Sequence, residues 1–134
     1  MSPYRLYPIA GLLGVTGVIL GALGAHTFNS WLQQRQTVDL WQTAVLYQLI
    51  HTVALLALAG WRSGGAGRMP PLVAAAAFCW IGGVILFSGS LYGLALGAPR
   101  ALGPITPVGG LALLAGWVLV MMVGGCRSPG PTSS

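Results

Sequence analysis

The chain has 134 residues, of which 55% are hydrophobic and only 5% are charged, and its net charge is +5. Soluble domains carry about 25% charged residues, so this composition excludes a wholly water-exposed surface. The mean hydropathy of +0.80 indicates a membrane protein with the lipid bilayer as its surroundings. The arginines stand singly near the ends of apolar stretches, whereas nucleic-acid binders cluster their cations, so we expect no nucleic-acid partner.

Four apolar stretches reach the length of about 20 residues that a helix needs to cross a bilayer. They predict helices over about residues 7–28, 39–61, 71–96 and 107–125. The predicted fold class is therefore all-α, a polytopic membrane four-helix bundle that forms a single domain over residues 1–127. Residues 128–134 hold only Ser, Pro, Gly and Thr, which predicts a disordered tail.

The first apolar stretch places its glycines on one side of a helix. At 100° per residue, Gly11, Gly14, Gly17, Gly21 and Gly24 project onto one broad face. Spacings such as Gly17-x-x-x-Gly21 let a second helix backbone approach closely. We expect this face to pack on a neighbouring helix of the same chain rather than to form a dimer.

The connection over residues 29–38 and the start of the second helix carry local signals. Trp31 and Arg35 stand among polar residues, which predicts a short amphipathic segment at the membrane interface. Asp39, the only acid in the chain, is followed three residues later by Gln42, which predicts a capping box. The acid therefore has a structural role available, and we do not assign it a catalytic one.

The second predicted helix carries polar side chains inside an apolar stretch. His51 lies four residues after Tyr47 and three after Gln48, so the three side chains share one helix face. Hydrocarbon cannot hydrogen-bond an amide or an imidazole, so this face is expected to look inward. His51 lies 12 residues beyond Asp39, which is about 18 Å of helix rise and places it near the bilayer midplane.

The arginines predict the orientation of the chain in the membrane. Four helices place both termini and the loop between the second and third helices on one side, with Arg5, Arg62, Arg68 and Arg127. Only Arg35 and Arg100 lie on the other side. The positive-inside rule then places both termini in the cytoplasm.

This orientation gathers most polar side chains in the outer half of the bundle. We expect a polar pocket that opens outward and ends at His51. Its candidate members are His26, Trp41, Gln42, Tyr47, Gln48, His51, Ser88, Ser90, Tyr92 and Thr106.

Five ordered segments also resemble a known family. They are G-A-L-G-A-H (21–26), L-W-Q-T-A-V-L-Y-Q-L-I-H (40–51), L-F-S-G-S-L-Y (86–92), I-T-P-V-G-G (105–110) and G-W (116–117). They are similar to the signature blocks of the YgdD/YwdK-like small membrane proteins, a family of unknown function that resembles the animal proteins called transmembrane protein 256. The resemblance implies a four-helix integral protein of the bacterial inner (plasma) membrane and no established activity.

Two functional hypotheses follow from these features. The first is a packing, assembly or accessory protein whose polar groups bond one another and which binds a membrane-protein partner or a second copy of itself. The alternative is a small-molecule, ion or proton site ending at His51, because ionisable groups within a membrane tend to be functional and histidine titrates near neutral pH.

An enzyme is not expected, and we predict no catalytic residue, no cofactor and no metal. The segment Gly89-Ser90-Leu91-Tyr92-Gly93 lacks the G-x-S-x-G spacing of a nucleophile elbow. His26 is expected near the surface and His51 about 18 Å below it, so one haem iron could not bind both. A zinc site needs about four close ligands, and the sequence does not bring four together.

Overall fold

The computed structural model describes residues 3–63 and 69–125, and the regular structure within these ranges is entirely helical. In chain order the elements are η1 (Pro3–Arg5), α1 (Leu6–Ala25), α2 (Asn29–Gln34), α3 (Val38–Ser63), α4 (Pro71–Ala95), η2 (Arg100–Leu102) and α5 (Ile105–Gly125). The predicted all-α fold with four long helices is confirmed. The largest difference in bounds is at the end of α1, which stops at Ala25 instead of residue 28. The tail predicted over residues 128–134 lies outside the described residues.

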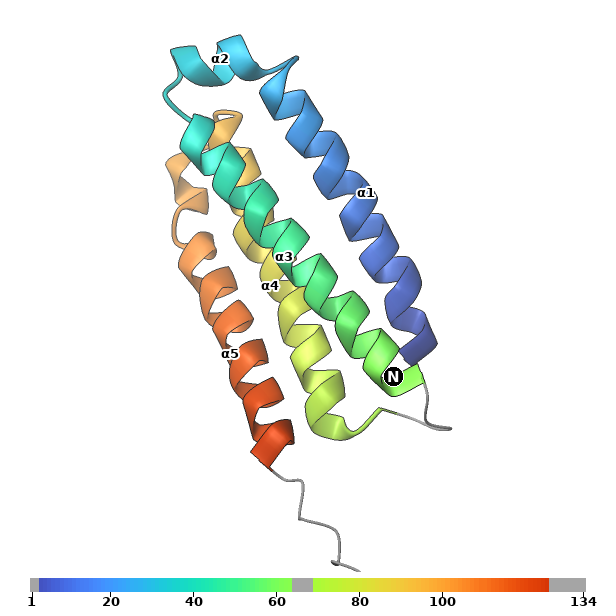
Figure 1. Cartoon of the computed structure of the whole chain (residues 1–134). Coiled ribbons are helices and arrows are strands. Elements are labelled where there is room, and N and C mark those ends of the chain that lie inside the picture. Colours follow the sequence, from blue (N-terminus) through green and yellow to red (C-terminus); the bar gives the residue numbers. More distant parts are fainter. Residues whose placement is uncertain (1–2, 64–68, 126–134) are drawn as a thin grey trace, which may run out of the picture.

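The four long helices are each able to cross a bilayer. They contain 20, 26, 25 and 21 residues, and a rise of about 1.5 Å per residue makes each at least as long as the roughly 30 Å hydrocarbon layer. Their candidate spans have mean hydropathies between 1.6 and 2.1. Figure 1 shows them running up and down side by side, with α2 at one end and the first and last described residues at the other.

The helices pack as an open series instead of a closed ring. The main contacts join α1 to α3, α3 to α4 and α4 to α5. The central helices α3 and α4 bury 39% of their candidate spans, whereas α1 and α5 bury 17%. Most of the surface of the two flanking helices is therefore left to lipid or to partners. We call the end of the molecule that carries α2 and η2 the α2 end.

The α1 glycines mediate the contact between α1 and α3, as the sequence predicted. A Cβ atom added to Gly17 would lie 2.7 Å from Leu49 Cδ2, and one added to Gly24 would overlap the indole of Trp41. Gly11 is the exception on this face, since nothing lies within 4 Å of its Cβ position. The glycine face thus lets α3 approach within the same chain.

Glycines have the same role between α4 and α5. A Cβ atom on Gly83 would lie 2.5 Å from the side chain of Leu113, and a Cβ atom on Gly109 would overlap the backbone of Phe87. The contact at Gly109 joins backbone to backbone, so no side-chain rotation would relieve it. This crossing fixes the distance between α4 and α5.

The start of α3 differs slightly from the predicted one. The helix begins at Val38, so Asp39 lies within its first turn and not at the capping position. An acidic side chain in the first turn still interacts favourably with the positive end of the helix dipole. Asp39 is exposed, which agrees with a structural role at the helix start.

We predict that Gly109→Ala destabilises the protein by about 1–3 kcal/mol, the usual cost of overpacking, because the added methyl group would collide with the backbone of Phe87. The matched control is Gly82→Ala, since nothing lies within 4 Å of that Cβ position. Unfolding of both variants by SDS titration, followed by circular dichroism, checks this. Equal stability of the two variants would contradict the close crossing of α4 and α5.

Candidate functional site

Gln48 is the centre of a hydrogen-bond network that joins three helices. Its side chain is only 4% exposed. Its Nε2 donates to the carbonyl oxygen of Leu13 at 2.8 Å and to Oγ1 of Thr16 at 2.9 Å, both on α1. Its Oε1 accepts a hydrogen bond from the hydroxyl of Tyr92 on α4 at 3.0 Å. One amide on α3 therefore ties α1 and α4 together inside the molecule.

His51 uses both of its ring nitrogens in hydrogen bonds. Nδ1 lies 2.7 Å from the carbonyl oxygen of Tyr47, which only accepts, so Nδ1 carries the proton. Nε2 accepts from the indole N–H of Trp117 at 3.1 Å. The imidazole is therefore neutral, in one defined tautomer. This bond links α3 to α5, although the main packing of α5 is on α4.

Aromatic side chains surround His51. The ring centroids of Trp80 and Trp117 lie 4.7 Å apart, and they lie 6.2 and 6.0 Å from the centroid of His51. Gly116 leaves room for Trp80, since a Cβ atom there would overlap the indole. The Nε1 atom of Trp80 is buried and has no hydrogen-bond partner among the described residues. The imidazole thus lies within an aromatic cluster.

A third polar contact joins α4 to α5, and it lies nearer the α2 end than His51 does. The hydroxyls of Ser90 and Thr106 lie 2.7 Å apart. Ser90 also donates to the carbonyl oxygen of Phe87 at 2.9 Å, so Thr106 supplies the proton of the inter-helix bond. Ser88 is buried as well, but its hydroxyl has no partner among the described residues. A small side chain at Ser88 serves packing, not this contact.

Trp41 fills the space between α1 and α3 at the α2 end. Its Nε1 donates to the carbonyl oxygen of Leu20 at 2.9 Å. Its ring packs edge-on against Phe28 and Tyr92, with centroids 5.7 and 4.9 Å away. Trp41 therefore continues the Gln48 network toward the membrane surface through its contact with Tyr92.

The remaining predicted site residues lie apart from these contacts. His26 caps the end of α1 with its backbone, and its side chain is exposed and makes no hydrogen bond to any described residue. Gln42 is exposed and borders a hollow beside Trp41. Six of the ten predicted residues form three bonded contacts around Gln48, His51 and Ser90, and Trp41 bonds Leu20 separately. His26, Gln42 and Ser88 lie outside these contacts.

Sequence reasoning missed four residues that complete these contacts. Thr16 had a signal, because it is the only hydroxyl among the glycines of α1. Thr52 bonds its own helix, donating to the carbonyl oxygen of Gln48 at 2.7 Å. Trp80 and Trp117 stand in apolar stretches, where their pattern does not distinguish a partner of His51 from packing.

A groove runs along the side of the molecule between α3 and α5. One hollow of about 590 Å³ is lined by His51, Tyr47 and Trp117 among others, and a second of about 270 Å³ continues toward Trp61. Its walls are mostly apolar. Within residues 3–63 and 69–125, no three His, Cys, Asp or Glu side chains come together in a way that could hold a metal ion.

We predict that Gln48→Leu lowers the free energy of unfolding by about 2 kcal/mol, because inter-helix bonds in membranes average about 0.6 kcal/mol and three are lost. Tyr92→Phe removes one bond and costs about 0.6 kcal/mol. In the Gln48→Leu background it costs nothing, since its partner is already gone. A double-mutant cycle by SDS unfolding measures this. Additive effects would contradict the bond between Tyr92 and Gln48.

Comparison with known proteins places this arrangement in a family. A family model described as "Protein of unknown function (DUF423)" matches residues 20–110, a range that contains all ten predicted site residues. No solved structure matches the chain.

Three relatives show how far the similarity extends. A UPF0382 membrane protein of Staphylococcus haemolyticus is 39% identical, over 88% of this chain and 93% of the relative. One of Schizosaccharomyces pombe is 35% identical, over 87% and 98%. UPF0382 membrane protein YwdK of Bacillus subtilis is 31% identical, over 88% and 94%. The resemblance to YwdK-like proteins is confirmed, and the chain is an integral membrane protein that belongs to the DUF423 family of unknown function.

Proposed function

We propose that this chain is a small accessory protein of the membrane, which stabilises or assembles a membrane-protein complex and catalyses no reaction. The observation that carries this proposal is that the two deepest polar side chains of α3, Gln48 and His51, are used in contacts within the protein. The amide of Gln48 bonds Leu13, Thr16 and Tyr92, and His51 bonds Tyr47 and Trp117. Except for the bond to Tyr47, which lies within α3, these bonds join helices, and they use every N–H of the two side chains and the lone pair of His51 Nε2.

The outer surface supports the same proposal. Helix α5 exposes large apolar side chains along its length, among them Leu111, Leu114 and Met121. Between α5 and α3, the groove described above presents apolar walls with the small residues Ala54 and Ala57. Small residues let a second helix approach closely in a membrane. A helix of a partner protein therefore fits this groove.

The alternative, a small-molecule, ion or proton site at His51, has weaker support. The groove does reach His51, but that side chain is only 4% exposed and both of its nitrogens are bonded. A ligand that took Nε2 would have to displace the indole of Trp117. A proton on Nε2 would point at another N–H donor, so a proton path through His51 would first have to break the link between α3 and α5.

Deletion of the gene in its native host tests the accessory role. We expect one membrane complex to disappear or change size on native gels of solubilised membranes. The wild-type gene and Val53→Phe restore it, because Val53 is 65% exposed on α3 and does not line the groove. Ala57→Phe does not restore it, because the new ring fills the groove. Unchanged complexes in the deletion strain, or equal rescue by the two variants, would refute the proposal.

The same proposal includes a location, the bacterial inner (plasma) membrane with both termini in the cytoplasm. Arg5 lies at the end opposite α2, whereas Arg35, directly after α2, and Arg100 in η2 lie at the α2 end. Arg68 and Arg127, which also enter the charge comparison, lie outside the described residues. The excess of arginine on the side of the termini supports a cytoplasmic position for them.

Reporter fusions at the C-terminus test this orientation. A green fluorescent protein fused there is expected to fluoresce, and an alkaline phosphatase fused there is expected to be inactive, since the phosphatase needs the oxidising side of the membrane for its disulfides. The opposite pair of results would invert the orientation. Fusions after residue 98, near the α2 end, provide the control and are expected to show the reverse pattern.

A further inference from the structure

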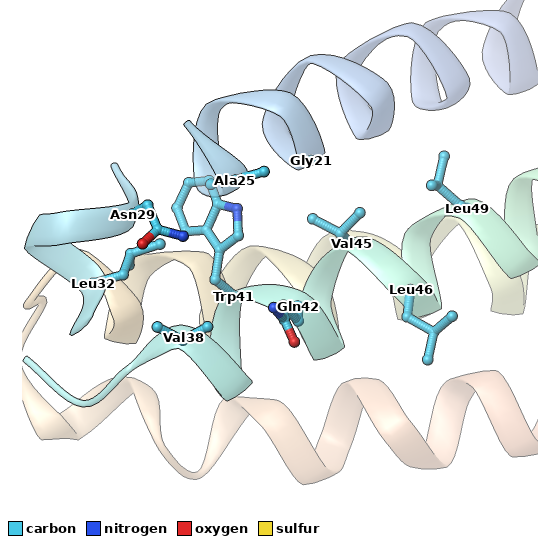
Figure 2. A pocket seen from close by; sticks show the side chains of 11 residues that line it. Gly21, Ala25, Asn29, Leu32, Val38, Trp41, Gln42, Val45, Leu46 and Leu49 are labelled. Carbon is cyan, nitrogen blue, oxygen red and sulfur yellow. The ribbon is translucent and has the colours of Figure 1, made fainter. Parts of the chain in front are cut away.

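A hollow of about 370 Å³ lies at the α2 end, between α1 and α3 and against α2. Figure 2 shows Trp41 and Val45 between the two long helices, with Asn29 and Leu32 of α2 closing the end of the hollow. The volume falls within the range of about 300–1,000 Å³ that is typical of ligand sites. The hollow is separate from the groove between α3 and α5, with which it shares no lining residue.

Trp41 forms one wall of the hollow. Its indole faces Gly24 so closely that no side chain could be added there, and its N–H is fixed to the carbonyl oxygen of Leu20. Because the side chain is buried and bonded, it stands as a rigid spacer between α1 and α3. The hollow lies beside this spacer and follows α3 past Leu46 to Leu49.

The polarity of the hollow changes along the helix direction. At the α2 end, the exposed amide of Gln42 makes no hydrogen bond to any described residue. At the same end, Asn29 accepts a hydrogen bond from Gln33 through Oδ1 at 2.7 Å, which leaves its NH2 group as a donor. Leu49 lies seven residues beyond Gln42, about 10 Å deeper, and the walls between them are aliphatic.

We propose that this hollow binds one acyl chain of a glycerophospholipid from the leaflet at the α2 end. The chain lies against Val45, Leu46 and Leu49, and the ester or phosphate oxygens accept hydrogen bonds from the amide NH2 groups of Gln42 and Asn29. The charged residues described at this end are Arg35, Arg100 and Asp39, so its net charge is slightly positive and does not repel a phosphate. This site does not depend on the accessory role proposed above.

Other occupants fit less well. Water is disfavoured because the walls are mostly apolar, and apolar cavities remain dry. A partner helix has a diameter of about 10 Å with its side chains and would run along the bilayer normal. It would collide with α2, which lies across the end of the hollow (Figure 1), whereas a lipid chain begins at that level.

Native mass spectrometry of the purified chain with added phosphatidylglycerol and phosphatidylethanolamine tests the proposal. We expect the wild type to retain one phospholipid after mild detergent removal. Ala25→Trp, which places an indole in the hollow, is expected to lower retention about tenfold. The matched control is Val18→Trp on the same helix, because Val18 is 63% exposed and does not line the hollow, and it is expected to retain lipid like the wild type.

Gln42→Leu provides a second variant that leaves the helix packing unchanged, since Gln42 is exposed. Loss of its hydrogen bond to the lipid is expected to weaken retention about threefold to tenfold. The proposal fails if the wild type retains no phospholipid or if Ala25→Trp, folded by circular dichroism, retains as much as Val18→Trp. It also fails if the hollow instead holds a second copy, seen as lipid-free dimers that Ala25→Trp abolishes.

Discussion

Hydrocarbon offers no hydrogen bonds, and this constraint accounts for the placement of the polar side chains in the molecule. An amide or imidazole at the depth of Gln48 or His51 would lose several kcal/mol if it faced lipid without a partner, about 4–8 on the cyclohexane scale. Both side chains turn inward and find partners on other helices. The polar groups therefore decide which faces of α3 meet α1, α4 and α5, although each bond adds little stability by itself.

Steric fit between large and small side chains completes this arrangement. Trp41 faces Gly24, and Trp80 faces Gly116, while the backbone of Phe87 meets Gly109. In a membrane, association of helices depends on such close packing because lipid tails are as apolar as leucine. The contacts follow the series α1, α3, α4, α5, and the two flanking helices keep wide apolar faces. An open series of this kind exposes grooves that a closed bundle would bury.

The sequence alone predicted the helices and the inward face of α3, because long apolar stretches and isolated polar residues within them have few alternatives in a bilayer. It also predicted that Gly17 packs within the chain. It did not predict the partners. Thr16 and Gln48 are 32 residues apart, and His51 and Trp117 are 66 apart. Their pairing depends on the order of the helices in space, which hydrophobic patterns do not encode. His26 was expected in the polar pocket, but its side chain is exposed, because a residue at a helix end is equally able to face water.

The bonding of Gln48 and His51 also indicates where binding is feasible. Neither side chain keeps a free N–H group to donate to a ligand. Gln42 and the NH2 group of Asn29, in contrast, remain available at the α2 end, next to a hollow with aliphatic walls. These two amide groups lie at the lipid-facing edge of the molecule, which is why we propose a lipid there.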